Sequence, residues 1–297
     1  MAPPSSEINY IHRETGELRA ERVYGERELR LLYETWLGSA LLHAFIKRKW
    51  FSHLAGFLHR STLSRRKIPS FIEHLEIDDT ESEFPATTYR SLDAFFTRKL
   101  KPETRPIDAN PFHLVTPAEG RVLAFAEIPG GKLDVKGCTV DIEELVGGLD
   151  GFRLGAGFVI RLAPCDYHRF HFPVDCQVSA PVRVGRVLHS VHPIALKAGA
   201  PAFRNKRMVS MLSDTNCGRM LQIEVGALTV GSIVQTYERG AMKRGQEKGY
   251  FRFGGSTVIL LTEPGRVAPD KDLLDATERG LETLVKVGTR IGLIGDS

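Results

Sequence analysis

The sequence has few cysteines, and their spacing indicates neither a disulfide framework nor a zinc ribbon. The four are Cys138, Cys165, Cys176 and Cys217, and no two of them form a C-x-x-C pair. A chain of 297 residues can bury a sufficient core without disulfide bonds. These cysteines are therefore typical of a protein kept in a reducing compartment.

Long apolar runs and targeting signals are also missing. No stretch reaches the roughly 18 apolar residues that a membrane-spanning helix needs. The longest candidate, residues 36–46, is interrupted by Gly38, Ser39 and His43. Residues 1–7 lack the basic and apolar regions of a secretory signal. We expect a protein that is not secreted and that associates with the cytoplasmic face of a membrane without crossing it.

Several common motifs are absent, which excludes whole classes of function. The chain has no phosphate-binding G-x-x-x-x-G-K-[ST], no G-x-S-x-G and no H-E-x-x-H. Gly155 and Gly157 lack the third glycine of a dinucleotide-binding loop. The formal charge of +4 is too small to imply nucleic acid. Nucleotide-binding, serine-hydrolase and nucleic-acid-binding functions are therefore not indicated.

Apolar residues recur at helical spacing in the first part of the chain. One series spans residues 29–45 and the second spans residues 50–58. The two series are Leu29, Leu32, Tyr33, Trp36, Leu37, Ala40, Leu41, Ala44 and Phe45, and Trp50, Phe51, Leu54, Phe57 and Leu58.

Basic residues surround the second series. Between Leu41 and Ser70 there are seven basic residues and no Asp or Glu. Two packed helices with a solvated cationic face are one interpretation. The other is an amphipathic element on an anionic membrane surface, where each basic residue contributes up to about 1 kcal/mol. The seven are Lys47, Arg48, Lys49, Arg60, Arg65, Arg66 and Lys67.

The pattern along the chain predicts an α+β fold with N-terminal amphipathic helices on a β-rich catalytic core. We expect residues 1–75 to be helical, residues 76–111 to form a linker with a short helix beginning at Ser91, and residues 112–297 to form the core. Short β-branched and apolar runs separated by glycines predict many short strands. Examples of such runs are 121–126, 157–162, 221–225 and 256–261.

Two histidines, His168 and His171, follow one of these strand-like runs in Asp166-Tyr-His-Arg-Phe-His. Their spacing can place both rings on one side of a turn or helix. Metal binding is one interpretation, and general acid–base catalysis is the other, because histidine titrates near neutral pH. His189 and His192 repeat the spacing, and we interpret them as structural.

The segment Phe253-Gly-Gly-Ser256 lies between two strand-like runs. Two glycines between strands are typical of a hairpin turn. They also permit a strained backbone, in which the hydroxyl of Ser256 approaches the carbonyl of Gly255 and attacks it. Such an attack needs a base and a carboxylate that orients the base.

Six blocks of sequence together resemble the phosphatidylserine decarboxylase family over about residues 89–265. The helices expected before them also resemble the N-terminal part of bacterial members. The blocks are Phe96-Thr-Arg-Lys-Leu-Lys-Pro-Glu-Thr-Arg-Pro-Ile107, Thr116-Pro-Ala-Glu-Gly120, Asp166-Tyr-His-Arg-Phe-His-Phe-Pro173, Asn205-Lys-Arg207, Glu224-Val-Gly-Ala-Leu-Thr-Val-Gly-Ser-Ile233 and Lys248-Gly-Tyr-Phe-Arg-Phe-Gly-Gly-Ser-Thr257.

The resemblance implies self-cleavage between Gly255 and Ser256, which leaves fragments 1–255 and 256–297 as a heterodimer and turns Ser256 into a pyruvoyl cofactor. His171 matches the family's base for this cleavage, and Glu119 stands where the family has the orienting aspartate. His168 matches the histidine of the later decarboxylation. Cys176 replaces a usual glycine, which predicts strain in a turn.

The implied reaction is decarboxylation of phosphatidylserine to phosphatidylethanolamine and CO2 in phospholipid biosynthesis, by a carboxy-lyase at an anionic membrane surface. The pyruvoyl carbonyl withdraws electrons as pyridoxal phosphate does. Two alternatives remain open. One is a soluble amino-acid decarboxylase of the same chemistry, and the other is a non-processing homologue that acts as a metal-binding domain through its histidines.

Overall fold

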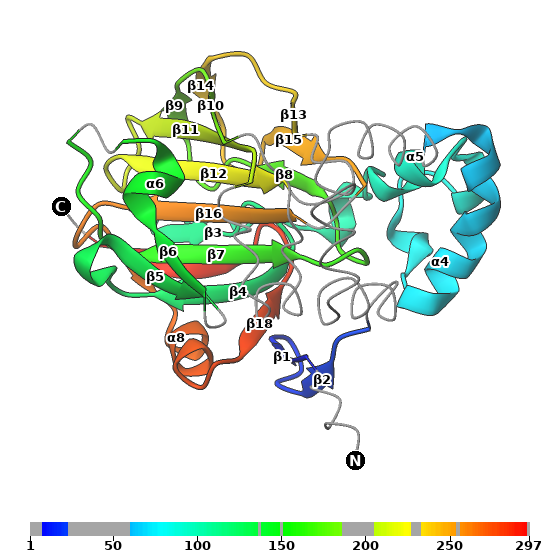
Figure 1. Cartoon of the computed structure of the whole chain (residues 1–297), viewed down its shortest axis with the longest axis horizontal. Coiled ribbons are helices and arrows are strands. Elements are labelled where there is room, and N and C mark those ends of the chain that lie inside the picture. The colour runs from blue at the N-terminus through cyan, green and yellow to red at the C-terminus, as the bar shows by residue number, and fades with distance from the viewer. Residues whose placement is uncertain are drawn as a thin grey trace, which may run out of the picture.

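The computed structural model describes residues 8–22, 60–135, 138–148, 151–185, 205–226, 233–253 and 256–295. A β-rich body occupies most of the described chain, and a small helical part lies beside it (Figure 1). The helices expected over residues 29–45 and 50–58 lie outside the described residues. His189, His192 and Gly255 also lie outside them.

The largest sheet has 11 strands in the order β14-β9-β11-β12-β16-β7-β4-β18-β1-β2, and β10 pairs with β11. All neighbouring pairs in it are antiparallel except β1 with β18. Its strands are β1 (Asn9–His12), β2 (Leu18–Ala20), β4 (Gly120–Phe125), β7 (Gly157–Leu162), β9 (Cys176–Val178), β10 (Val182–Val184), β11 (Arg207–Ser213), β12 (Met220–Gly226), β14 (Gly240–Met242), β16 (Ser256–Thr262) and β18 (Glu282–Val285).

Three smaller sheets and four α-helices complete the described elements. The small sheets have the orders β13-β15-β8, β17-β19-β3 and β5-β6. Their strands are β3 (His113–Val115), β5 (Lys132–Val135), β6 (Cys138–Asp141), β8 (Arg169–His171), β13 (Ile233–Gln235), β15 (Glu247–Phe251), β17 (Val267–Pro269) and β19 (Arg290–Ile294). The helices are α4 (Ile68–Leu75), α5 (Leu92–Phe96), α6 (Ile142–Val146) and α8 (Lys271–Glu278), and short 3₁₀ turns include η2 (Thr62–Lys67).

Strand β16 lies between β12 and β7 and is buried along its whole length. Its sequence, STVILLT, is rich in β-branched and apolar residues, which suits a strand covered on both faces. Val258 and Leu260 face one core cluster, and Ile259 and Leu261 face the other, as the two-residue period requires. The first residue of this strand, Ser256, therefore begins one of the most deeply buried elements of the protein.

The helical part packs its own small core against the loop before Ser256. Helix α5 begins after Ser91, whose side-chain oxygen accepts a hydrogen bond from the backbone N–H of Ala94 at 3.2 Å. Phe71 and Phe95 are fully buried in an edge-to-face contact. Phe253 joins this cluster, with its ring 4.8 Å from that of Phe96. The predicted helix start at Ser91 is thus confirmed, and its helix packs against the segment that precedes Ser256.

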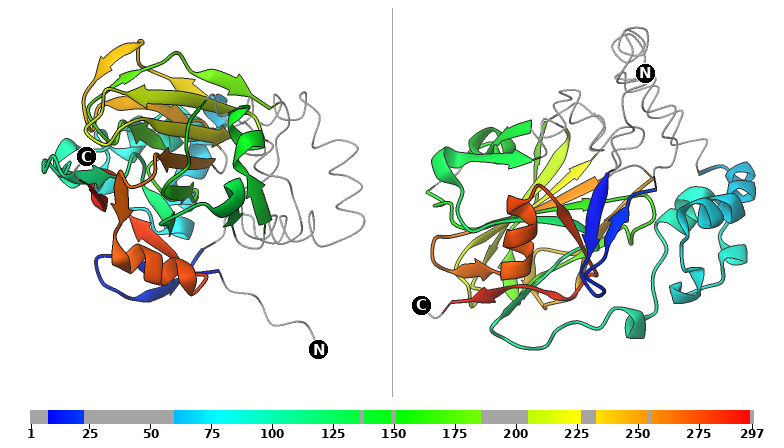
Figure 2. Two further views of the ribbon diagram at one scale, coloured as in Figure 1. Left: turned by 90° about the vertical axis from the view of Figure 1, so that its left-hand side faces the viewer. Right: turned by 90° about the horizontal axis from the view of Figure 1, so that it is seen from below.

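The α+β class and the β-rich core are confirmed, but the prediction that residues 1–75 are helical is wrong for residues 9–20. These residues form the hairpin β1–β2, which lies beside β18 near the other end of the chain (Figure 2). Tyr10 pairs with Glu282, so the strand depends on a partner more than 270 residues away. A short amphiphilic segment carries little local signal for such a pairing.

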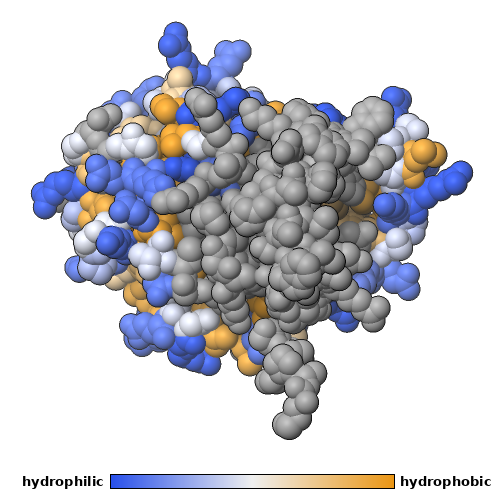
Figure 3. Space-filling view, in the orientation of Figure 1, coloured by the Kyte–Doolittle hydropathy of each residue, from blue (hydrophilic) through white to orange (hydrophobic). Residues whose placement is uncertain are grey.

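Outside the grey area, the face in Figure 3 mixes hydrophilic residues with small hydrophobic areas, which lie over the β-rich body and over the helical part. Among the described residues, no helix is long and apolar enough to span a bilayer.

Candidate functional site

Ser256 stands at the start of β16, opposite Leu162 on one side and Gly226 on the other. Its side chain is 1% exposed, and its hydroxyl has no hydrogen-bond partner in the part of the chain that the structure describes. A buried hydroxyl without a partner costs about 1–3 kcal/mol. The structure therefore holds a serine hydroxyl in an environment that a purely structural serine rarely occupies.

The turn that follows β7 brings His168 beside the segment leading to Ser256. The backbone N–H of Phe251 donates to the carbonyl of His168 at 2.9 Å, and the ring of Phe96 lies 3.8 Å from the imidazole. His168 Nδ1 lies 2.9 Å from the carbonyl oxygen of Asp166, which can only accept, so Nδ1 carries the hydrogen. Nε2 is then left with a lone pair.

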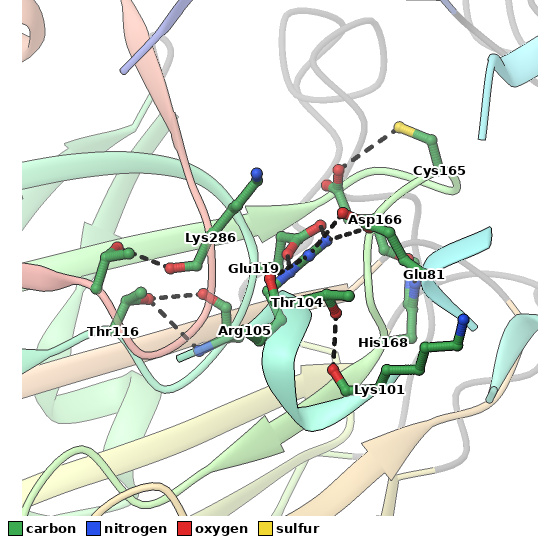
Figure 4. A network of polar contacts seen from close by, with 12 residues as sticks. Glu81, Lys101, Thr104, Arg105, Thr116, Glu119, Cys165, Asp166, His168 and Lys286 are labelled. Carbon is green, nitrogen blue, oxygen red and sulfur yellow. Dashed lines mark hydrogen bonds and ion pairs between the residues drawn. The ribbon is translucent and has the colours of Figure 1, made fainter. Parts of the chain in front are cut away.

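The pKa of the His168 imidazole is lowered to about 3, mainly by complete burial; the carbonyl of Asp166 opposes this effect, and the nearby cations Arg98 and Arg121 add to it. The ring is therefore neutral at pH 7. Its Nε2 has no hydrogen-bond partner among the described residues. His168 is thus prepared to accept a proton, and it can donate one only after it has accepted one. Figure 4 shows its position close to Asp166.

His171 is the last residue of β8. Its backbone N–H donates to the carbonyl of Pro117 at 2.7 Å, and its own carbonyl accepts from Gln222 Nε2 at 3.1 Å. Burial lowers the pKa of the imidazole to about 4, and Nδ1 has no partner within the described ranges. His171 is therefore a neutral base whose ring is not yet oriented by a carboxylate.

Glu119 does not pair with His171 in this structure. Both of its carboxylate oxygens accept from the guanidinium of Arg105, which also forms a salt bridge with Glu81 (Figure 4). Burial raises the pKa of Glu119, and Arg105 opposes that effect. The structure thus brings Glu119 to a cation where the sequence comparison predicted contact with the base.

Gly120 explains why Glu119 lies so close to the central sheet. A Cβ atom at residue 120 would lie 2.5 Å from the carbonyl oxygen of Arg161, so only glycine fits against this backbone. This close approach lets β4 pair with β7. The Thr116–Gly120 block therefore lies at the end of the sheet where β7 leads into the turn that contains His168.

The sequence analysis did not predict the buried ion pair between Lys248 and Glu224, although both residues stand in the matched blocks. Both side chains are fully buried, and Lys248 Nζ donates to the two oxygens of Glu224 at 2.8 and 2.9 Å. The register of β15 shifts between Glu247 and Gly249, and such an irregularity re-aims a side chain. The only available signal was the presence of two charges in apolar strands.

A second buried ionic group lies where β4, β7 and β18 meet. Arg161 pairs with Glu21 and Glu282, and Arg121 pairs with Glu21 and Asp166. The carboxylate of Asp166 also accepts from the backbone N–H of Ala163 at 2.7 Å. This paired network fixes the start of the turn that carries His168.

Metal binding through the histidines finds no support among the described residues, where no group of three or more His, Cys, Asp or Glu side chains could hold an ion. The expected strain at Cys176 is also wrong. Cys176 is the first residue of β9, and the non-glycine residues with positive φ in the described ranges are Glu76 and Asp214.

Comparison with known proteins extends over almost the whole chain. The family model described as phosphatidylserine decarboxylase matches residues 92–293. Proteins named phosphatidylserine decarboxylase proenzyme are similar at full length. The one from Fusobacterium nucleatum is 40% identical over 291 residues, which cover 96% of this chain and 97% of that protein. The one from Chlamydia trachomatis is 38% identical with the same coverage of both chains, and the one from Clostridium botulinum is 38% identical over 96% and 99%.

Proposed function

The chain belongs to the phosphatidylserine decarboxylase family, and we propose that it acts as a carboxy-lyase which converts phosphatidylserine to phosphatidylethanolamine and CO2. The observation that carries this proposal is the similarity to proenzymes over 96% of the chain. A proenzyme has to be processed before it acts, and the buried hydroxyl of Ser256 supports the bond before this residue as the site of processing.

In the proposed cleavage, Ser256 Oγ attacks the carbonyl carbon of Gly255. The C–O bond forms as the C–N bond to the Ser256 nitrogen breaks, so the peptide becomes an ester and the nitrogen takes the proton. Elimination then releases the carboxylate of Gly255, and water replaces the nitrogen as ammonia. The new N-terminus of fragment 256–297 is the pyruvoyl group, and the two fragments remain together as a heterodimer.

We assign His171 as the base that takes the hydroxyl proton. A neutral imidazole is required for this step, and the lowered pKa of His171 keeps the ring neutral through the physiological range. Glu119 is proposed as the carboxylate that orients the base. In the uncut chain Arg105 holds Glu119, so one of its oxygens has to leave the guanidinium before it reaches the imidazole.

The residues around Ser256 fit a pyruvoyl group. The hydroxyl is buried, has no described partner, and its neighbours across the sheet are Leu162 and Gly226, so a small carbonyl group would meet an apolar surface. When formed, this group supplies a carbonyl that withdraws electrons from the α-carbon of a bound amine.

We propose that His168 moves the proton of the decarboxylation step. Nε2 holds a lone pair, so it can take up the one proton that decarboxylation consumes when hydrogen replaces the carboxylate. After CO2 has left, the same nitrogen returns that proton to the α-carbon. The low pKa of the buried ring favours this return, because the protonated imidazole is a strong acid.

We also propose that the protein rests on the surface of an anionic membrane. Arg65, Arg66 and Lys67 are exposed in the turn η2, and Leu63 beside them is 73% exposed. Cations around an exposed apolar side chain are typical of interfacial binding. The amphipathic series before this turn supplies further basic and aromatic residues.

The test of the proposed processing is the mass of the purified protein. We expect two fragments that meet at residues 255 and 256, with the smaller one blocked to Edman degradation. Ser256→Ala should leave an intact chain of 33.1 kDa. Ser210→Ala, at another buried serine in the same sheet, serves as the control and should cut normally. Cleavage of Ser256→Ala at the same bond would show that the proposed nucleophile is wrong.

Vesicle flotation tests the proposed membrane contact. The protein should float with phosphatidylserine vesicles at low salt and release as salt screens the charges. Replacing Arg65, Arg66 and Lys67 by glutamine should weaken this binding, whereas the same change at the exposed Lys271 and Lys243 should not. Equal flotation of both variants would rule out a role for η2.

A further inference from the structure

Arg98 is a buried cation without a carboxylate partner in the described structure. It follows helix α5, and only 4% of its surface is exposed. Its guanidinium donates to the carbonyl of Phe95 at 3.5 Å and to the carbonyl of Cys165 at 3.4 Å. Both distances lie at the long end of hydrogen bonding, and Nε has no partner within the described ranges. The guanidinium therefore has only weak hydrogen bonds to compensate for the loss of water around its charge.

Other buried arginines in the protein are better paired. Arg105, Arg121 and Arg161 each form salt bridges with two carboxylates. Arg207 has no carboxylate partner either, but it donates to three backbone carbonyls at 2.5 to 2.9 Å. Arg98 thus differs from these other arginines, because it forms no salt bridge among the described residues and its two hydrogen bonds are long, although the negative charge of Glu119 partly offsets its burial.

Arg98 lies beside the proposed reaction centre. It contacts Cys165 in the turn that carries His168, and its positive charge contributes to the lowered pKa of that histidine. Phe96, two residues earlier, packs against the imidazole at 3.8 Å. The ring of Phe95 lies 4.8 Å beneath the guanidinium and holds it in place. The donors of Arg98 that lack acceptors are therefore held near the histidine by the same helix.

We propose that Arg98 binds the phosphodiester of the substrate headgroup, an inference that rests on the proposed decarboxylation of phosphatidylserine. Three bonds separate phosphorus from the α-carbon, which places the phosphate roughly 4 Å from the reacting atom. A guanidinium forms paired, charge-assisted hydrogen bonds with phosphate oxygens. The anion supplies the acceptors that Arg98 lacks in the free protein.

The substrate carboxylate is the less suitable partner for this arginine. Its charge disappears as CO2 leaves, so a salt bridge to it would be stronger in the ground state than in the transition state and would slow the reaction. The phosphate keeps its charge throughout. Binding at the phosphate also explains how the site can select a phospholipid over free serine, which has the amine and the carboxylate but no phosphate.

The test compares mature wild-type protein with Arg98→Met, which keeps the length of the side chain and removes its charge. We expect binding of dihexanoyl phosphatidylethanolamine, measured by calorimetry, to weaken about 10- to 100-fold, because charge-assisted hydrogen bonds are lost. This product has the phosphate but no carboxylate. KM for dihexanoyl phosphatidylserine should rise similarly, and Arg98→Lys should recover part of the loss. Unchanged product binding with a raised KM would assign Arg98 to the carboxylate and overturn the proposal.

Stability separates this role from a structural one. Removing an unpaired buried charge should raise the melting temperature of Arg98→Met by about 2–4 °C and leave self-cleavage intact. The matched control, Arg207→Met, should lower the melting temperature, because three carbonyls lose their donors. A destabilised or uncut Arg98→Met would show that the residue is structural. Absence of any phosphatidylserine decarboxylation by the cut wild-type protein would instead contradict the proposed function itself.

Discussion

Two groups of buried polar side chains differ in how they are satisfied. In the paired network, each carboxylate faces a guanidinium. In the second group, which we call the reactive wall, no side chain forms a salt bridge within the described structure, and each has a nitrogen or oxygen without a hydrogen-bond partner there. The paired network comprises Glu21, Arg121, Arg161, Asp166 and Glu282, and the reactive wall comprises Arg98, His168, His171 and Ser256.

We interpret the paired network as side chains that hold the fold, and the reactive wall as side chains proposed to take part in the reaction. A buried ion pair is strongly destabilised when one member is removed, so the paired network holds its strands in one arrangement. A buried polar atom without a partner costs about 1–3 kcal/mol, and substrate or a reaction step can supply what is missing. Asp166 joins the two groups, because its carboxylate belongs to the paired network and its carbonyl orients His168.

Removal of His171, the proposed base for self-cleavage, should have the largest effect. We expect His171→Ala to slow self-cleavage by roughly 10⁴-fold, as loss of a triad member does. A gel time course of the freshly synthesised chain measures the rate constant. His74→Ala, at an exposed histidine, is the control and should cut at the wild-type rate. Rapid cleavage of His171→Ala would leave the reaction without its assigned base.

Breaking the paired network should lower the stability of the fold. In the uncut Ser256→Ala background, Arg161→Met should lower the free energy of unfolding by about 3–5 kcal/mol, because Glu282 and Glu21 both lose this buried cation and Glu21 keeps the longer contact with Arg121. Urea titration measures the loss. Arg98→Met in the same background should shift the transition in the opposite direction. A stabilised Arg161→Met would remove the distinction between the two groups.

Glu119 tests the boundary between the groups, because it is paired with Arg105 but assigned to catalysis. We expect Glu119→Gln to slow self-cleavage by about 10²-fold, less than the full triad value, since its carboxylate does not already orient His171. Glu81→Gln removes the other carboxylate from Arg105 and should change the rate little. An unchanged rate in Glu119→Gln would remove Glu119 from the mechanism.

The smallest expected effect is on the pH dependence of folding stability. The pKa of His168 falls from 6.5 to about 3 on folding, so the unfolded chain binds the proton more readily below pH 6.5. Stability should therefore fall as pH is lowered from 6.5 to 5, by up to about 1.4 kcal/mol per pH unit for this residue. His168→Gln should flatten the dependence in urea titrations. An equal slope in both proteins would show that His168 is not buried neutral.

Much of the core was predictable because its signals are local. The runs at 157–162 and 256–261 are confirmed as β7 and β16, since a buried strand shows itself as a short apolar segment. The hairpin at residues 9–20 was predicted wrongly, because its strand character depends on pairing with β18. The roles of His168, His171, Glu119 and Ser256 stay predictions from the family.

The sequence by itself determined the family, the β-rich core and the positions of the serine and histidines, because these rest on local patterns and ordered blocks. Only the tertiary structure decided which charges are paired. In the structure Glu119 pairs with Arg105, and Arg98 has no salt bridge to a carboxylate among the described residues. The physical reason is that an ion pair depends on distance in space and on exclusion of water, and neither is encoded by the spacing of residues along the chain.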